Sequence, residues 1–228
     1  MKKFEDFPLR ERKQTKTRIG ILDAALDFMR HRFLQDIKVD EICQVVEISK
    51  GTFFSYFPKK TDLIVYAIRL WSIGVGWEYL NSPESQRGLA YIRKLFHNLA
   101  QDCLENPICH MDIMAMRAYS PEIIQLMNDG NLHVVSDADR LFRYPNQAGI
   151  LEIPEGTIVT YFRKNLVIAM ERGELPGTIH VDSVLISLTS LLYGALHAAM
   201  AKKDIQSLPR EYDRQLDILW AGLRTLYH

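Results

Sequence analysis

Hydrophobic residues recur every three or four positions along most of the chain, the spacing that places them on one face of an α-helix. In residues 19–33 the pattern is carried by Ile19, Leu22 and Leu26, and residues 39–46 repeat it over a shorter length. The same spacing predicts further helices over residues 62–80, 84–105, 107–119, 154–173, 181–203 and 210–227. No segment alternates polar and apolar residues between hairpin turns, so the pattern predicts an all-α fold.

A short helix with a tight turn before it is predicted after residue 48. Ser49 is a good N-cap for this helix, and Pro58 ends the aromatic run that follows. Short helices packed into about 45 residues and separated by a tight turn are typical of a helix-turn-helix. We therefore expect an N-terminal three-helix helix-turn-helix domain followed by a larger helical domain.

The aromatic run does not fit a uniformly buried helix. Phe53 and Phe57 are four residues apart, so they share a face and are predicted to be core. Phe54 and Tyr56 then border solvent. One side of this helix must therefore face something other than the protein's own core.

Two residues at the start of this helix are poor choices for the helix alone. Lys50 places a cation in the first turn, where the helix dipole disfavours it, and Gly51 costs about 1 kcal/mol against alanine. Both suit an approaching phosphate, because Lys50 supplies charge and Gly51 lets the backbone come close. Thr52 and Ser55 carry short hydroxyls that reach base edges or phosphates. The alternative is a capped core helix with chance lysines.

Charge is unevenly distributed, although the net charge of the chain is zero. Residues 1–60 carry 13 basic and 9 acidic residues, against 15 and 19 in the remainder, and residues 1–18 carry 7 and 3. A basic N-terminal arm over residues 1–17 indicates a polyanion partner at this end, or a solvated tail.

Other features bear on compartment and chemistry. No run of about 18 apolar residues is present and the N-terminus has no apolar signal core, so we expect no membrane span and no secretion. The three cysteines suit reduced thiols in the cytoplasm.

No hydrolase, metalloprotease, P-loop or dinucleotide motif occurs, so we expect no enzyme activity, no metal and no cofactor. Asp137 and Asp139 are interpreted as part of a solvated face.

Three strings, RIGILDAALDFM, VDEIC and ISKGTFFSYFPKKTDL, lie within residues 18–63. Together they resemble the tetracycline-repressor (TetR) family of bacterial regulators. The resemblance implies a DNA-binding domain over residues 18–62, with its helix-turn-helix at about 38–57, and a ligand-binding and dimerisation domain over residues 63–228. Glu47 stands where most relatives have glycine, which implies either a left-handed residue at some cost or a slightly different turn, and Phe54 replaces a tyrosine that in relatives often touches DNA.

The resemblance also implies DNA contacts. Facing the major groove are Ser49, Lys50, Thr52, Phe54 and Ser55, with Gly51 permitting close approach. Contacting the DNA backbone are Thr17, Arg18, Lys38, Tyr56 and Lys60. The implied partner is double-stranded DNA with a palindromic operator, because a two-fold dimer places two such helices about 34 Å apart, one turn of DNA.

Apolar stripes on the last two predicted helices suit either dimerisation or the core of the monomer. The stripes are formed by Leu188, Leu192, Ala195, Ala199, Leu216, Leu219 and Leu223. The resemblance favours a homodimer, since the family's last two helices form a four-helix bundle with those of a second copy.

Large soft side chains between residues 71 and 161 suit either an apolar ligand pocket or ordinary packing. The pocket candidates are Trp71, Trp77, Phe96, His110, Met114, Tyr119 and Tyr161. The resemblance implies that a small molecule binds in this region and shifts the spacing of the DNA-binding heads.

These inferences predict a homodimeric, DNA-binding transcriptional regulator, a repressor released by a small, largely apolar effector. One alternative is a helical homodimeric sensor or partner-binding protein with a degenerate DNA head, in view of Glu47 and Phe54. Another is a thiol-based redox-sensing regulator acting through Cys103 and Cys109.

Overall fold

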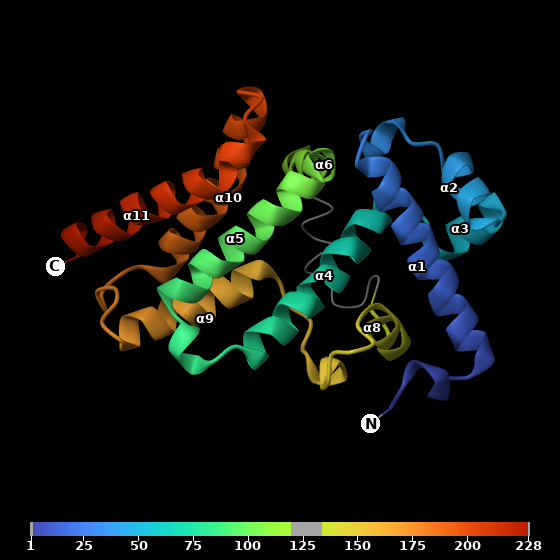
Figure 1. Cartoon of the computed structure of the whole chain (residues 1–228), viewed down its shortest axis with the longest axis horizontal. Coiled ribbons are helices and arrows are strands. Elements are labelled where there is room, and N and C mark those ends of the chain that lie inside the picture. The colour runs from blue at the N-terminus through green and yellow to red at the C-terminus, as the bar shows by residue number, and fades with distance from the viewer. Residues whose placement is uncertain (1, 120–133, 228) are drawn as a thin grey trace. The chain divides into compact units, whose positions relative to one another are not determined.

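A computed structural model describes residues 2–119 and 134–227, apart from the side chains of 117–119. The described residues form helices and no strand, which confirms the predicted all-α class (Figure 1). The helices are α1 (Leu9–Met29), α2 (Val39–Val46), α3 (Lys50–Tyr56), α4 (Asp62–Asn81), α5 (Leu89–Glu105), α6 (Pro107–Tyr119), α8 (Asp137–Arg143), α9 (Ile158–Glu171), α10 (Val181–Ala201) and α11 (Leu208–Leu226).

The chain divides into two compact units. The first comprises Met1–Glu78 and Ile108–Gly156, and the second comprises Tyr79–Pro107 and Thr157–His228. The predicted DNA-binding segment, residues 18–62, falls wholly within the first unit. That unit also takes in most of α4 and α6, and all of α8, from the region predicted to bind a ligand.

Helix α1 begins at Leu9, two turns before the hydrophobic pattern predicts a helix. Residues 9–17, expected to form a basic arm, are instead helical. Pro8 precedes the first turn, and the following Arg, Glu, Lys and Gln residues are good helix formers. These turns lack a regular apolar stripe, which is why periodicity did not reveal them.

The turn between α2 and α3 has the first of the two conformations that its sequence allows. Glu47 adopts a left-handed conformation with φ 57°, at the C-cap of α2, which confirms that expectation. The Ile48 backbone N–H donates to the Cys43 carbonyl at 3.0 Å. Ser49 caps α3, since its Oγ accepts the Thr52 backbone N–H at 3.0 Å. These bonds set the direction in which α3 leaves α2.

A buried ion pair joins α1 to α8 in the first unit. Arg18 Nη1 donates to Asp139 Oδ2 at 2.5 Å, and the Asp139 side chain is fully buried. The same oxygen accepts the Ser136 backbone N–H at 3.1 Å, at the start of α8. The prediction of a solvated face was therefore wrong for Asp139, whereas Asp137 is exposed. Periodicity could not show this, because the partner lies 121 residues away.

The second unit packs α5, α9, α10 and α11 around an aromatic core. The Phe96 ring stacks on Phe162 with centroids 5.5 Å apart and meets the edge of Tyr212 at 5.0 Å. The Tyr212 hydroxyl donates to the Leu192 carbonyl at 2.8 Å, tying α11 to α10. Arg93 adds ion pairs from α5 to α11.

Most residues of the predicted dimer stripes lie inside the second unit. Five are buried in the single chain, namely Leu188, Leu192, Ala199, Leu216 and Leu223, while Ala195 and Leu219 are partly exposed. The surface of these five residues is already covered by their own chain, so they contribute to the monomer core, and their part in an interface stays a prediction. The large apolar side chains exposed on α10 and α11 are Ile186, Ile218 and Leu226.

Helix α10 bears on the expectation of no membrane span. Within the described part of the chain it is the one helix long and apolar enough to cross a membrane by length and composition, with mean hydropathy 1.6. Asp182 and His197 interrupt the apolar residues of α10, so the sequence shows no unbroken apolar run there. A single such helix is weak evidence, since core helices of globular proteins meet the same requirement.

Candidate nucleic-acid interface

Helix α3 has one buried and one exposed face. Phe53 and Phe57 are 0% and 1% exposed, whereas Phe54 is 46% exposed. Tyr56 is partly exposed. These placements confirm that two of the aromatics are core and two border solvent. The polar residues predicted to face the groove are exposed or partly exposed: Ser49, Lys50, Gly51, Thr52 and Ser55.

Hydrogen bonds hold the polar residues of α3 in place. Ser49 Oγ and Thr52 Oγ1 lie 2.9 Å apart, and the Ser55 hydroxyl donates to the Thr52 carbonyl at 2.6 Å. Lys50 Nζ pairs with Asp40 Oδ1 of α2 at 2.8 Å, with both side chains about 60% exposed. An exposed pair of this kind is worth little energy, so a phosphate can displace the carboxylate.

Gly51 has no explanation within the protein's own packing. A Cβ atom built at this position would lie 3.7 Å from Ser49 Oγ, an ordinary van der Waals distance. The backbone of α3 is helical there, so no positive φ requires glycine. The residue is therefore unfavourable for the helix and unnecessary for the fold, which fits the close approach of an external partner.

Two residues predicted to touch the DNA backbone are bound to the protein itself. The Arg18 guanidinium is paired with Asp139, as described above. Lys60 Nζ donates to the Gln35 and Ile37 carbonyls at 3.1 and 2.7 Å, beside the loop that precedes α2. Burial lowers the pKa of Lys60, against the raising effect of nearby carboxylates, of which Asp112 is the strongest. Both cations thus have structural roles that the sequence did not indicate.

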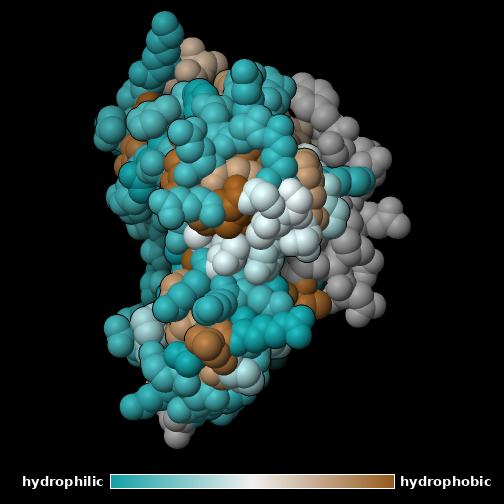
Figure 2. Space-filling view, turned by 90° about the vertical axis from the view of Figure 1, so that its right-hand side faces the viewer, coloured by the Kyte–Doolittle hydropathy of each residue, from teal (hydrophilic) through white to brown (hydrophobic). Residues whose placement is uncertain are grey.

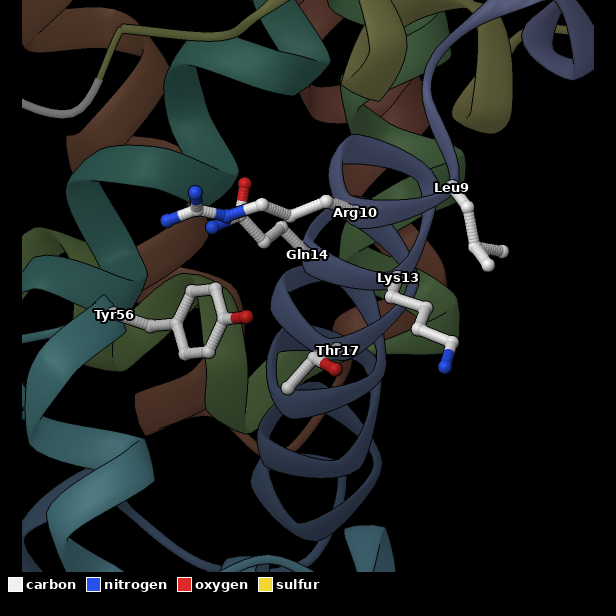
Figure 3. A pocket seen from close by; sticks show the side chains of 6 residues that line it. All are labelled: Leu9, Arg10, Lys13, Gln14, Thr17 and Tyr56. Atoms are coloured by element: carbon white, nitrogen blue, oxygen red, sulfur yellow. The ribbon is translucent and has the colours of Figure 1, made fainter.

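A shallow hollow lies beside α3 in the same unit (Figure 3). It is lined by Leu9, Arg10, Lys13, Gln14, Thr17 and Tyr56. Figure 3 shows Tyr56 pointing its hydroxyl towards α1, with Arg10 and Gln14 extending from α1 near it and Lys13 reaching to the other side. Sequence reasoning identified Thr17 and Tyr56 but missed the other polar lining residues. Their spacing of three and four residues was a usable signal once the helix was known to begin at Leu9.

Figure 2 looks onto the side where α1, α2 and α3 lie in Figure 1. Its surface is mostly hydrophilic, with hydrophobic residues in small separate patches. Lys38, the N-cap residue of α2, is exposed, and its backbone N–H donates to Glu41 Oε2 at 2.9 Å. A polar surface with scattered apolar groups suits phosphates and thymine methyls better than a dry protein interface.

The residues predicted to form an effector pocket are divided between the two units. Trp71, Trp77, His110 and Met114 belong to the first unit and are partly buried. Phe96 and Tyr161 are buried in the second unit against aromatic partners. The side chain of Tyr119 lies outside the described residues. Burial lowers the pKa of His110 to about 4, which keeps its imidazole uncharged near neutral pH.

All three cysteines are buried as free thiols. Burial raises the pKa of Cys109 to about 11 and also raises the pKa of Cys43. Because the thiolate is the reactive form, these environments weigh against thiol-based redox sensing.

Comparison with known proteins agrees with this geometry. Residues 21–67 match the family model for bacterial regulatory proteins of the tetR family. Among solved structures, GusR of Salmonella enterica is 18% identical with a TM-score of 0.60, covering 92% of this chain and 95% of its own. A Rhodococcus sp. protein described as a TetR-family transcriptional regulator is 14% identical with a TM-score of 0.61, covering 90% and 99%. At these identities the structures show a shared fold. No curated protein sequence matches the chain.

Proposed function

Because residues 21–67 match the family model for bacterial regulatory proteins of the tetR family, we propose that the chain belongs to this family, binds a palindromic operator as a homodimer and represses transcription until a small, largely apolar effector releases it. The single observation that carries the DNA-binding part is the two-faced helix α3. Its aromatic anchors Phe53 and Phe57 are buried, and on its other face Lys50 and Phe54 are exposed and Thr52 is partly exposed.

Selection of bound duplexes from a random DNA pool tests this role. The parent is compared with Lys50→Ala/Thr52→Ala, which removes two groove-facing side chains but keeps the bond from the Thr52 backbone to Ser49. Lys202→Ala, an exposed lysine at the end of α10, is the control. We expect the parent and the control to enrich the same palindrome and the double variant to lose it. Failure of the parent to enrich any sequence at low salt would refute DNA binding.

The homodimer is supported by apolar groups that the single chain leaves exposed. Ile186 on α10 is 69% exposed and Ile218 on α11 is 58% exposed, in a unit whose core is otherwise well covered. We expect Ile186→Glu/Ile218→Glu to shift the sedimentation of the protein from dimer towards monomer, because two charges would be buried at the interface. An unchanged dimer would place the interface elsewhere.

Effector release rests on the family and on the soft, partly buried side chains of α4 and α6. Trp71 and Trp77 lie on α4, and His110 and Met114 lie on α6. An uncharged imidazole and large apolar side chains in the same unit suit an apolar ligand with one polar group. Screening apolar compounds for release of the selected duplex tests this step, with quenching of tryptophan fluorescence as a second readout. A reporter gene behind the palindrome distinguishes repression from activation.

A further inference from the structure

Some cationic side chains of the first unit are bound to groups of the protein itself, and others are not. Arg18 and Lys60, which the sequence assigned to the DNA backbone, are bound to Asp139 and to backbone carbonyls. The polar ends of Arg10 and Lys13 have no hydrogen bond or ion pair with any described residue. A phosphate that bound Arg18 or Lys60 would have to replace those contacts, whereas Arg10 and Lys13 are ready to bind.

Three further polar groups around the hollow also lack a hydrogen-bond partner among the described residues. Gln14, Thr17 and the Tyr56 hydroxyl make no side-chain hydrogen bond within the part of the chain that the structure describes. Residues 10, 13, 14 and 17 follow the i, i+3, i+4, i+7 pattern, so their backbone positions lie along one face of α1, from which Arg10 and Gln14 extend to the Tyr56 side and Lys13 to the other side (Figure 3). No carboxylate lines the hollow. The surface therefore combines donors and positive charge with no competing acid.

The position of Tyr56 shows which partner this surface suits. Tyr56 is the last residue of α3, the helix that presents the groove-facing residues. A polyanion that contacts α3 passes within reach of its hydroxyl and hence of the basic face of α1. The spaced cations match phosphates along a DNA strand, and a nucleic acid backbone needs no deep pocket.

We propose that the first two turns of α1 form a second phosphate-binding surface, in which Arg10, Lys13 and the Tyr56 hydroxyl bind the DNA backbone beside the groove that α3 enters. This inference rests on the proposed function and changes its assignment of backbone contacts. It gives residues 9–17 a defined role as an extension of the DNA-binding head.

The test measures binding of the selected palindromic duplex by fluorescence anisotropy over a series of salt concentrations. Arg10→Ala/Lys13→Ala is compared with the parent and with Lys16→Ala, an exposed lysine of the same helix that does not line the hollow. We expect the double variant to bind roughly tenfold more weakly at 0.1 M salt and the slope of log K against log salt to fall by about 2. The preferred base sequence should stay the same, since phosphates carry no sequence information.

Each other outcome has a definite meaning. If the parent binds the palindrome and the double variant keeps its affinity and salt slope, this inference is overturned and the proposed function stands. An equal loss in Lys16→Ala, or a changed base preference in the double variant, also overturns it. A parent that binds no duplex refutes both. Helix content by circular dichroism confirms that each variant is folded, and Tyr56→Phe, which keeps the ring, should cost affinity without altering the fold.

Discussion

Replacing Gly51 with alanine separates the needs of the fold from the needs of DNA binding. In the protein alone the added Cβ meets nothing closer than Ser49 Oγ at 3.7 Å. Position 51 is helical and exposed, so alanine fits the backbone without strain. The substitution should therefore favour the folded state.

The expected gain follows from helix propensity. Alanine is better than glycine by about 1 kcal/mol in a helix interior, and somewhat less is expected in the first turn of α3. For a chain of this size, 1 kcal/mol raises Tm by about 2–4 °C. In the complex the same methyl group would lie where the DNA comes closest. We expect a loss of at least about tenfold in affinity, equivalent to about 1.4 kcal/mol.

The assay pairs thermal unfolding with binding to the selected duplex. Gly20→Ala is the matched control, because Gly20 is also helical and in the same unit and its added Cβ would lie 3.5 Å from Val46 Cγ1, inside the protein. It should raise Tm without weakening DNA binding. A Gly51→Ala protein that is more stable and binds as tightly as the parent would show that DNA does not approach this backbone. A less stable Gly51→Ala protein would show that the glycine serves the fold.

Three further outcomes are expected. Asp139→Ala should lower the free energy of unfolding by about 3 kcal/mol in denaturant titrations, because it leaves a partly buried guanidinium unpaired, whereas exposed Asp137→Ala should have a small effect. Glu47→Gly should raise the free energy of unfolding by about 1 kcal/mol, since it relieves a left-handed residue, and a loss of stability would contradict the φ of 57°. Burial raises the pKa of Asp213, but hydrogen bonds, chiefly from Arg93, lower it by a larger amount, so the net pKa lies below its usual value. Its stabilisation is complete above the unfolded pKa of about 4 and is lost as pH falls through the folded pKa, so the stability difference between the parent and Asp213→Asn should shrink below about pH 4.

Local rules were sufficient for the part of the site that lies on α3. The four-residue spacing of Phe53 and Phe57 identified the buried face, and Ser49 identified the start of the helix. Glutamate in place of glycine at position 47 indicated a strained turn. Each of these depends on neighbours within a few residues in the sequence. Sequence patterns report such interactions directly.

The features that sequence reasoning missed depend on distant partners or on unpatterned helix. Nothing near Arg18 indicates that Asp139 will bury its carboxylate against it. The stripe containing Leu188 and Leu216 was recognised as apolar, but periodicity does not say whether the chain or a second copy covers it. The first turns of α1 consist of residues with high helix propensity and have no apolar face, so hydrophobic periodicity does not predict them.

The structural roles of Asp112 and Lys60 bear on how an effector would act. Asp112 of α6 accepts the Leu34 backbone N–H at 2.5 Å, and Lys60 holds the carbonyls of Gln35 and Ile37. Both contacts bind the loop that precedes α2, and both lie in the first unit.

His110, an effector candidate, is two residues from Asp112 on α6. Under the proposed mechanism, a ligand that displaces α6 therefore moves the start of the helix-turn-helix through a direct hydrogen bond. Asp112→Asn keeps an acceptor oxygen but lacks the charge, so it should weaken the coupling between effector and DNA more than it weakens either binding event alone. Equal coupling in the parent and the variant would exclude this route.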